Sequence, residues 1–278
     1  MSPARAISAG RTARLLRSEL ALTFRRRRNA ALLAVLALVP ILTAVAVKAQ
    51  SRPGQGGSIL GGITDNGLFA ALAAFLVAGP LFIPLVVAVV AGDSVAGEAG
   101  SGTLRYLLTV PVGRTRLLAI KFAALVIWGT ACAVVVAAAG ELAGLVLFPS
   151  GDVVLLSGAT VSYGDGLVRL LLVLVYVALT ITVVSAIGLF VSTMTEVPLA
   201  AMAATLTVTV AAEVVDQIPQ LSAIHGWLPT HYWLQWIDLL RDPVRTGDMV
   251  TGLLVTLAYV LVFVSMAWAR FGGKDVTS

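Results

Sequence analysis

The chain has 278 residues, of which 59% are hydrophobic and only 12% are charged. A soluble protein is about half apolar and about a quarter charged, so this composition excludes a chain built mainly from water-soluble domains. The net charge of +5 would also suit a nucleic-acid-binding protein. The basic residues flank long apolar runs, however, so lipid headgroups and membrane topology explain them better, and we expect no nucleic-acid partner.

Residues 1–28 are rich in arginine, and Leu16, Leu20 and Phe24 recur every four residues. This spacing predicts an N-terminal amphipathic helix that lies on the membrane surface. A plain basic flank that orients the first span explains the arginines equally well. The same stretch imitates a signal peptide, but the apolar run at 29–47 exceeds the usual core of about 7–15 residues and more spans follow, so we expect an uncleaved first span.

Six apolar runs have about the length that a helix needs to cross a bilayer. We expect spans at residues 30–47, 68–91, 122–148, 167–190, 199–212 and 250–268. The predicted fold class is an all-α membrane protein with six transmembrane helices in a single domain, residues 1–278. With the N-terminus inside, 14 of the 19 Lys and Arg fall on the cytoplasmic side and 5 on the outer side. This bias predicts a multi-pass protein of the inner or plasma membrane with both termini cytoplasmic.

Pro80 and Pro84 lie one turn apart on one face of the second span. Each proline frees a backbone carbonyl, which must find another partner in lipid. A hinge or a wall of a transport path would supply that partner, and a simple kink is the alternative.

The loop at residues 92–117 separates the second and third spans and is basic, which favours a cytoplasmic position. Ser101 or Thr103 can cap a short helix, which Pro111 would end. On that helix one face would be apolar, formed by Leu104, Leu107 and Leu108. A helix this short needs a docking partner.

This loop resembles the first cytoplasmic loop of type-2 ABC transporter permeases, the ABC-2 family. The motif residues are Glu98, Gly102, Thr103, Leu104, Leu107, Leu108, Pro111, Val112 and Arg114. In that family the loop forms a coupling helix that docks on a separate ATPase subunit. The resemblance therefore implies an ATPase contact at Glu98, Gly102, Thr103, Leu104, Arg105, Leu107, Leu108, Pro111 and Arg114. Gly97-Glu98 departs from the more acidic residues of many relatives, and an ordinary basic connecting loop is the alternative.

The third span contains Gly140 and Gly144, a GxxxG pair that allows close helix packing. Glu141 between them is costly in lipid, so it is either a residue of the transport path or a partnered or protonated structural carboxyl. Cys132, the one cysteine, lies inside an apolar run and is expected to be a buried structural thiol.

Thr205 and Thr209 share one face of the fifth span. Their hydroxyls either bond back to their own helix or line a path. The resemblance implies the path, because the second and fifth spans of such permeases border it at the dimer interface. The path candidates are Pro80, Pro84, Thr205, Thr209 and Glu141.

Residues 213–248 are expected to form an outer re-entrant or interfacial region of short helices. Trp227, Tyr232, Trp233 and Trp236 suit a membrane interface. His225 and His231 have no carboxylate or cysteine at a fixed ligand spacing, so we expect no metal site.

The chain contains no G-x-x-x-x-G-K-[ST] phosphate loop, so it is not expected to be an enzyme or to bind a cofactor. The resemblance implies a permease subunit of an ATP-driven exporter. ATP and Mg would bind to two partner ABC ATPase subunits, and a second permease copy or a related permease would complete the path in the lipid bilayer. A polytopic membrane scaffold without an ATPase partner is the alternative, and an intramembrane enzyme is a third possibility that the missing His/Glu motifs disfavour.

Overall fold

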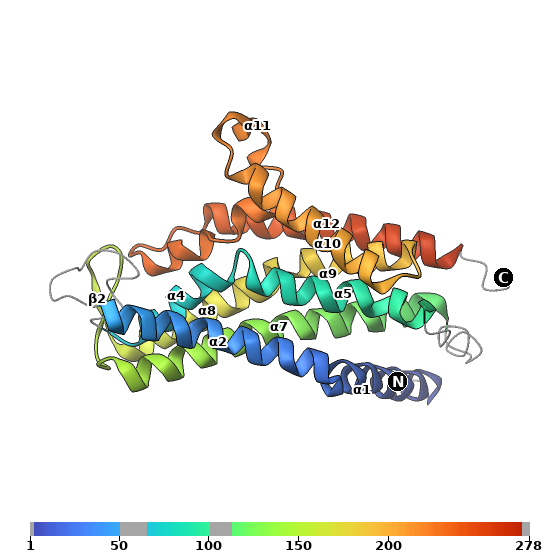
Figure 1. Cartoon of the computed structure of the whole chain (residues 1–278), viewed down its shortest axis with the longest axis horizontal. Helices are drawn as coiled ribbons and strands as arrows, with labels where there is room; N and C mark the ends of the chain where they lie inside the picture. Colours follow the sequence, from blue (N-terminus) through green and yellow to red (C-terminus); the bar gives the residue numbers. More distant parts are fainter. Residues whose placement is uncertain (1–2, 51–65, 101–112, 274–278) are drawn as a thin grey trace.

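The computed structural model describes residues 3–50, 66–100 and 113–273 of the chain. Most of the described residues are helical (Figure 1). Within the described residues, one small hairpin pairs strands β1 (Val153–Val154) and β2 (Thr160–Val161) in antiparallel register. The prediction of an all-α protein is confirmed.

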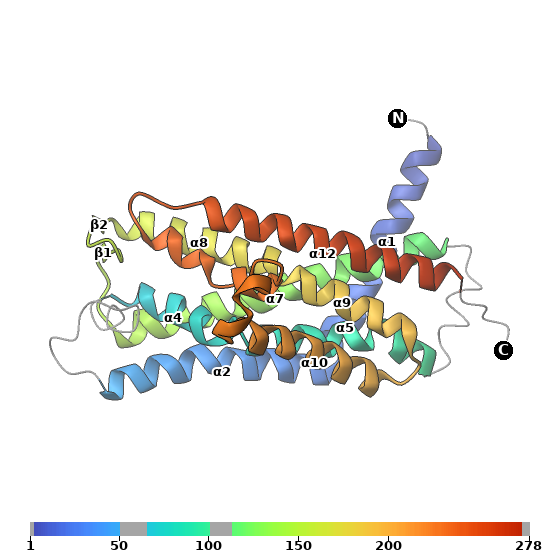
Figure 2. The ribbon, with the colours of Figure 1, turned by 90° about the horizontal axis from the view of Figure 1, so that it is seen from above.

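In the described part of the chain, six helical segments are long and apolar enough to cross a membrane. They are α2 (Arg27–Gln50), α5 (Phe82–Gly100), α7 (Arg114–Leu147), α8 with α9 (Tyr163–Thr180 and Thr182–Met194), α10 (Pro198–Asp216) and α12 (Gly247–Gly272). Each overlaps one predicted span, so the six-span prediction is confirmed. Before them comes α1 (Pro3–Arg25), which runs at a steep angle to the bundle (Figure 2).

The second span is broken in two. Helix α4 (Leu68–Ala78) ends just before Pro80, and α5 begins at Phe82. Pro84 lies in the first turn of α5, where a missing N–H removes no helical hydrogen bond. The two prolines therefore mark a helix break and the start of the next helix, and not a kink within one continuous helix.

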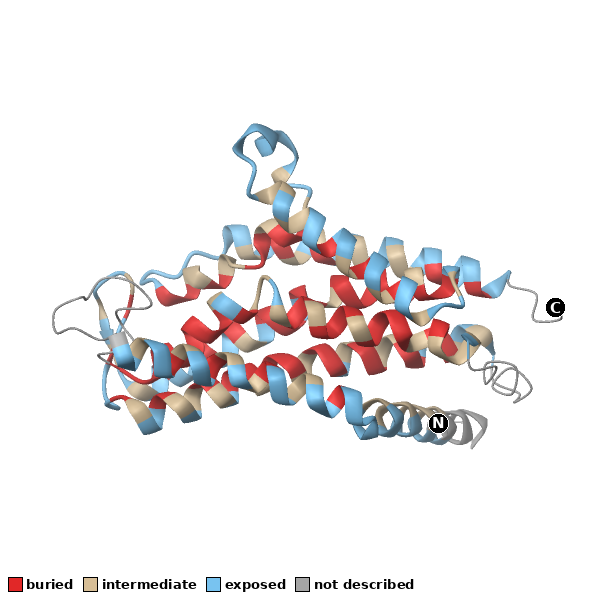
Figure 3. Ribbon diagram, in the orientation of Figure 1, coloured by how far each residue is buried: buried red, intermediate tan, exposed pale blue. Residues whose placement is uncertain are grey.

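The broken helix, α7 and α8 with α9 hold most of the buried residues (Figure 3). Helix α4 packs on α7, while α5 packs on α9 and α10. Helices α2, α10 and α12 lie outside this core and expose apolar side chains such as Leu254, Leu257 and Leu261 of α12. Outward-facing leucines of this kind suit a hydrocarbon environment.

Glycines bring α4 and α7 into close contact. A Cβ atom placed on Gly140 would lie 2.6 Å from the Ala71 Cα, and one on Gly144 would lie 2.0 Å from the Gly67 carbonyl oxygen. Only residues without a side chain allow backbones to approach this closely. The predicted packing role of the GxxxG pair is confirmed.

Short helices follow α10 in the predicted outer region. They are η1 (Pro219–Leu221), α11 (Ser222–His225), η2 (Pro229–Tyr232) and η3 (Gln235–Leu240). Helix α11 projects away from the bundle (Figure 1). Trp227 is exposed, but Trp233 and Trp236 are buried, with the Trp236 ring packed edge-on against Phe75 of α4. These two rings therefore pack inside the protein, and the interfacial position of this region stays a prediction.

Candidate functional site

One end of the bundle holds α1, the last turn of α5, the first turn of α7 and the last turn of α12 (Figures 1 and 2). We call it the α1 end. Both α5 and α7 continue into this end beyond the predicted spans, which stopped at residue 91 and began at residue 122. The added turns carry charged side chains that pair with one another inside the protein.

Lys121 is the centre of the first ion-pair group. Its side chain is 2% exposed, and its ammonium lies 2.6 Å from Glu98 Oε1 of α5 and 3.2 Å from Glu19 Oε1 of α1. A buried charge is tolerated only when partners replace its lost hydration. Lys121 of α7 therefore links α1 and α5, through Glu19 and Glu98, which are 102 and 23 residues away from it in the sequence.

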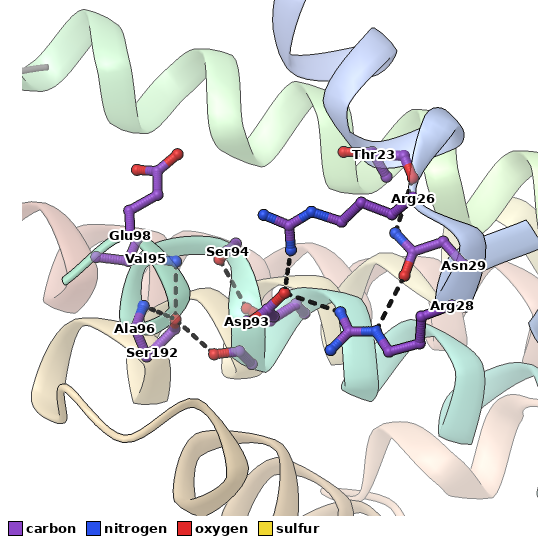
Figure 4. Close-up of polar contacts among 12 residues, drawn as sticks. Thr23, Arg26, Arg28, Asn29, Asp93, Ser94, Val95, Ala96, Glu98 and Ser192 are labelled. Atoms are coloured by element: carbon purple, nitrogen blue, oxygen red, sulfur yellow. Dashed lines mark hydrogen bonds and ion pairs between the residues drawn. The ribbon is translucent and has the colours of Figure 1, made fainter. Parts of the chain in front are cut away.

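Asp93 is the centre of the second group. Its carboxylate, 9% exposed, accepts hydrogen bonds from Arg26 and, at 2.8 Å, from Arg28 (Figure 4). Arg26 lies between α1 and α2, so Asp93 holds the junction of these two helices. The buried Asn29 side chain accepts from Arg28 Nε and donates to the Thr23 carbonyl, which fixes the same junction from within.

Ser192 of α9 is inserted against the backbone of α5. Its hydroxyl oxygen accepts hydrogen bonds from the backbone N–H groups of Val95 and Ala96 at 2.9 and 2.8 Å. The same hydroxyl donates to the Gly92 carbonyl at 2.7 Å (Figure 4). A side chain that joins the hydrogen-bond ladder of a helix fixes the path of that helix. Here it fixes α5 one turn from Asp93 and Glu98.

Close backbone contacts link the same stretch of α5 to α10. A Cβ atom on Gly92 would lie 2.6 Å from the Met202 backbone nitrogen, and one on Gly100 would lie 2.7 Å from the Glu196 carbonyl oxygen. Glu196 belongs to the turn between α9 and α10. Helix α5 is thus held on one side by ion pairs to α1 and α7, and on the other by close packing to α10.

A small cavity of about 40 Å³ lies between these groups. Its lining includes Glu19, Arg26, Asp93, Glu98 and Lys121. This volume suits a few water molecules, since one water needs roughly 10–15 Å³ measured in this way. The arrangement is therefore a junction between helices and not a pocket for a substrate.

The start of α7 is also tied to the end of α12. Arg114 Nη1 donates to the Gly272 carbonyl at 2.9 Å, and Trp268 Nε1 donates to the Thr115 hydroxyl at 2.9 Å. The two described residues of the predicted ATPase contact, Glu98 and Arg114, thus flank residues 101–112 and both contact other helices. The remaining predicted contact residues lie outside the described part of the chain: Gly102, Thr103, Leu104, Arg105, Leu107, Leu108 and Pro111.

Three of the predicted path residues make hydrogen bonds within the protein. Thr205 and Thr209 are buried, and their hydroxyls donate to the carbonyls of Ala201 and Thr205 in the preceding turn of α10. Glu141 accepts a hydrogen bond from the Tyr163 hydroxyl at the start of α8. The two threonine hydroxyls thus bond to their own helix and the Glu141 carboxyl has a partner, while a role of these residues in a path stays a prediction.

Sequence reasoning assigned no role to Glu19, Asp93, Lys121 or Ser192. Two signals were present. Glu19 is the one acidic residue among the arginines of residues 1–28, and Lys121 follows four apolar residues. A charged side chain in either position is costly on a buried helix face unless an opposite charge pairs with it.

The comparisons with known proteins agree with this architecture. The profile described as an ABC-2 family transporter protein matches residues 15–212, which include α2 to α9 and most of α10. No curated protein was found to match the chain. The chain belongs to the ABC-2 family of transporter proteins and is a membrane permease subunit.

Proposed function

We propose that this permease is the membrane-spanning part of an ATP-driven exporter, coupled to two separate ABC ATPase subunits that bind ATP and Mg. The α1 end would face the cytoplasm, as the distribution of Lys and Arg favours. Two copies, or one copy and a related permease, would enclose the path.

The observation that carries the proposal is the ion-pair group at Lys121. Helix α5 ends and α7 begins on either side of residues 101–112, the segment whose sequence resembles a coupling helix. Glu98 lies close before this segment and Lys121 close after it, and the two side chains meet at 2.6 Å. Glu19 adds α1 to the same group. A force applied to the segment would therefore reach α1, α5 and α7 together.

Such a joint movement is what ATP-driven coupling requires. ATP would close the ATPase pair, draw the docked segments together and shift the bundle between two packings of its helices. The ion pairs resist separation, because leaving a buried charge without its partner costs about 3–5 kcal/mol. The three helices would thus move as one body while more weakly held contacts rearrange.

The movement would pass from α5 to α10, because these helices touch backbone to backbone at Gly92 and Met202. The buried face of α10 holds Thr205 and Thr209 against its neighbours. Its opposite face exposes apolar residues such as Val210 and Val214. In the proposed dimer this exposed face would lie toward the second copy, so that α10 borders the path.

The test is a pull-down of the tagged chain from its native membranes in mild detergent, with ATP hydrolysis assayed in the eluate. A co-purifying ATPase that carries a phosphate-binding loop would support the proposal. A clean and inactive eluate, under conditions in which other ABC complexes stay intact, would overturn it and favour a scaffold without an ATPase partner.

A further inference from the structure

Both histidines of the chain meet at one carboxylate beyond the fifth span. The sequence contains two histidines, His225 at the end of α11 and His231 in η2. Asp216 is the last residue of α10. His231 Nδ1 lies 2.8 Å from Asp216 Oδ1, and His225 Nδ1 lies 3.9 Å from the same oxygen. No sequence spacing indicated this cluster, because the carboxylate comes from a different helix.

The hydrogen bonding of His225 shows which of its nitrogens is free to ligate. His225 Nε2 lies 3.1 Å from the Ile218 carbonyl oxygen. A carbonyl can only accept, so Nε2 carries the hydrogen and Nδ1 of the neutral ring carries a lone pair. That lone pair faces the Asp216 carboxylate. Two acceptors that face each other need a proton or a metal cation between them, and a carbonyl partner on the far ring nitrogen is the usual support of a metal-binding histidine.

The burial of the cluster also suits a bound ion. The side chains of Asp216 and His225 are 12% and 16% exposed, and that of His231 is 37% exposed. One ligand atom from each residue lies within 4.8 Å of the others. Ligand atoms around a tetrahedral zinc ion are roughly 3.3 Å apart, given Zn–N and Zn–O lengths of about 2.0–2.2 Å. Small side-chain rotations would therefore close the site, and the open side at His231 leaves a position for water.

We propose that Asp216, His225 and His231 bind one divalent transition-metal ion, with Zn²⁺ as the best fit. Two imidazole nitrogens and one carboxylate oxygen are a zinc ligand set, whereas Mg²⁺ and Ca²⁺ prefer oxygen ligands alone. The ion would join the end of α10 to α11 and η2, and so fix the chain reversal after the fifth span. The family match ends at residue 212, before the first ligand, so the site is not part of what that match describes.

The binding test uses the full chain, purified in detergent with a tag free of histidine and stripped with EDTA. Titration with Zn²⁺ alone is expected to reach one ion per chain. Co²⁺ in its place is expected to give the visible absorption of a tetrahedral site. Asp216→Asn, His225→Ala and His231→Ala should each weaken Zn²⁺ binding by about 100-fold or more. Asp238→Asn is the matched control, because it removes a carboxylate of the same region that pairs instead with Arg241.

A second measurement needs no variant. Because the chain has two histidines and both are in the cluster, histidine modification by diethylpyrocarbonate reports on this site alone. Zn²⁺ is expected to slow the modification of both residues in the wild-type chain. Unchanged modification, or Zn²⁺ binding that survives all three substitutions, would overturn the proposal and leave only a hydrogen-bonded Asp216–His231 pair.

Discussion

The Lys121 ammonium of α7 lies 2.6 Å from the Glu98 carboxylate of α5, inside the protein and 23 residues away along the chain. The residues between them include 101–112, which resemble the coupling segment of ABC-2 permeases. The ion pair thus joins the two helices that lie on either side of the segment proposed to bind the ATPase. Glu19 of α1 shares the same ammonium, so three helices meet at one charge.

Lys121→Met is expected to lower the stability of the permease. The substitution leaves the Glu19 and Glu98 carboxylates buried without their cation, which costs about 3–5 kcal/mol. Adding Glu19→Gln and Glu98→Gln removes those charges and should recover most of the loss. Thermal unfolding in detergent measures both effects, and Lys48→Met, at an exposed lysine, is the control. A triple variant less stable than Lys121→Met would contradict this account.

Asp93→Asn is expected to loosen the junction between α1 and α2. Arg26 and Arg28 lose the carboxylate that holds them, so this junction should open more easily. Tryptic cleavage after residues 25–28 should become about tenfold faster, which corresponds to an opening that is ~1.4 kcal/mol easier. Asp165→Asn, an exposed carboxylate at the start of α8, should leave cleavage unchanged. Equal rates for the two variants would show that Asp93 does not hold the junction.

Ser192→Ala is expected to destabilise the contact between α9 and α5. The change removes two accepted hydrogen bonds and one donated one at a buried site, with a cost of about 1–3 kcal/mol. Ser94→Ala is the matched control, because the Ser94 hydroxyl donates to the Ala91 carbonyl of its own helix. Thermal unfolding should separate the two variants, and an equal effect of both would argue against the role of Ser192.

Gly144→Val is expected to impair folding. A side chain at this position would meet the Gly67 backbone, and overpacking of this kind costs about 1–3 kcal/mol or more. Gly151→Val places the same side chain where nothing lies within 4 Å. The yield of monodisperse protein after detergent extraction should fall for the first variant alone. A normal yield for Gly144→Val would mean that α4 and α7 can separate freely.

Leu104→Asp is expected to abolish co-purification of the ATPase while membrane insertion stays normal. The prediction follows from the apolar pattern of residues 104, 107 and 108, which would form the docking face. A glutamine substitution at Thr109, off that face, serves as the control. If the Leu104→Asp variant retains its ATPase, the assignment of a coupling helix to this loop is wrong.

The six spans were predictable because hydropathy and length report directly on the cost of placing a helix in lipid. Their ends were not. Asp93, Glu98, Arg114 and Lys121 read as residues of a polar loop, yet all four lie on helices. A prediction from sequence ends a span at a charged residue, because the sequence does not show which opposite charge will pair with it. Arg26 pairs with Asp93, and Lys121 pairs with Glu98. Helices α5 and α7 can therefore continue past these residues without burying an unpaired charge.

The partners themselves could not be predicted, because they come from helices far apart in sequence. Glu19 and Lys121 are 102 residues apart, and Ser192 is 96 residues from Ala96. The burial of Trp236 was unpredictable for the same reason, because its ring packs against Phe75 of α4, which is distant in the sequence. Close packing at Gly140 and Gly144 was predictable, because a spacing of four residues places both on one helix face.

The measurement that tests the central claim most directly is the ATP hydrolysis rate of the purified complex that contains Glu19→Gln/Glu98→Gln/Lys121→Met. This variant removes the ionic link without leaving a buried charge, and it keeps residues 101–112, which hold seven of the nine predicted ATPase-contact residues. The account predicts that the ATPase subunits remain bound and that the rate per bound subunit changes several-fold, because closure no longer moves α1, α5 and α7 together. A wild-type rate with full ATPase binding would contradict the claim that these ion pairs transmit the movement.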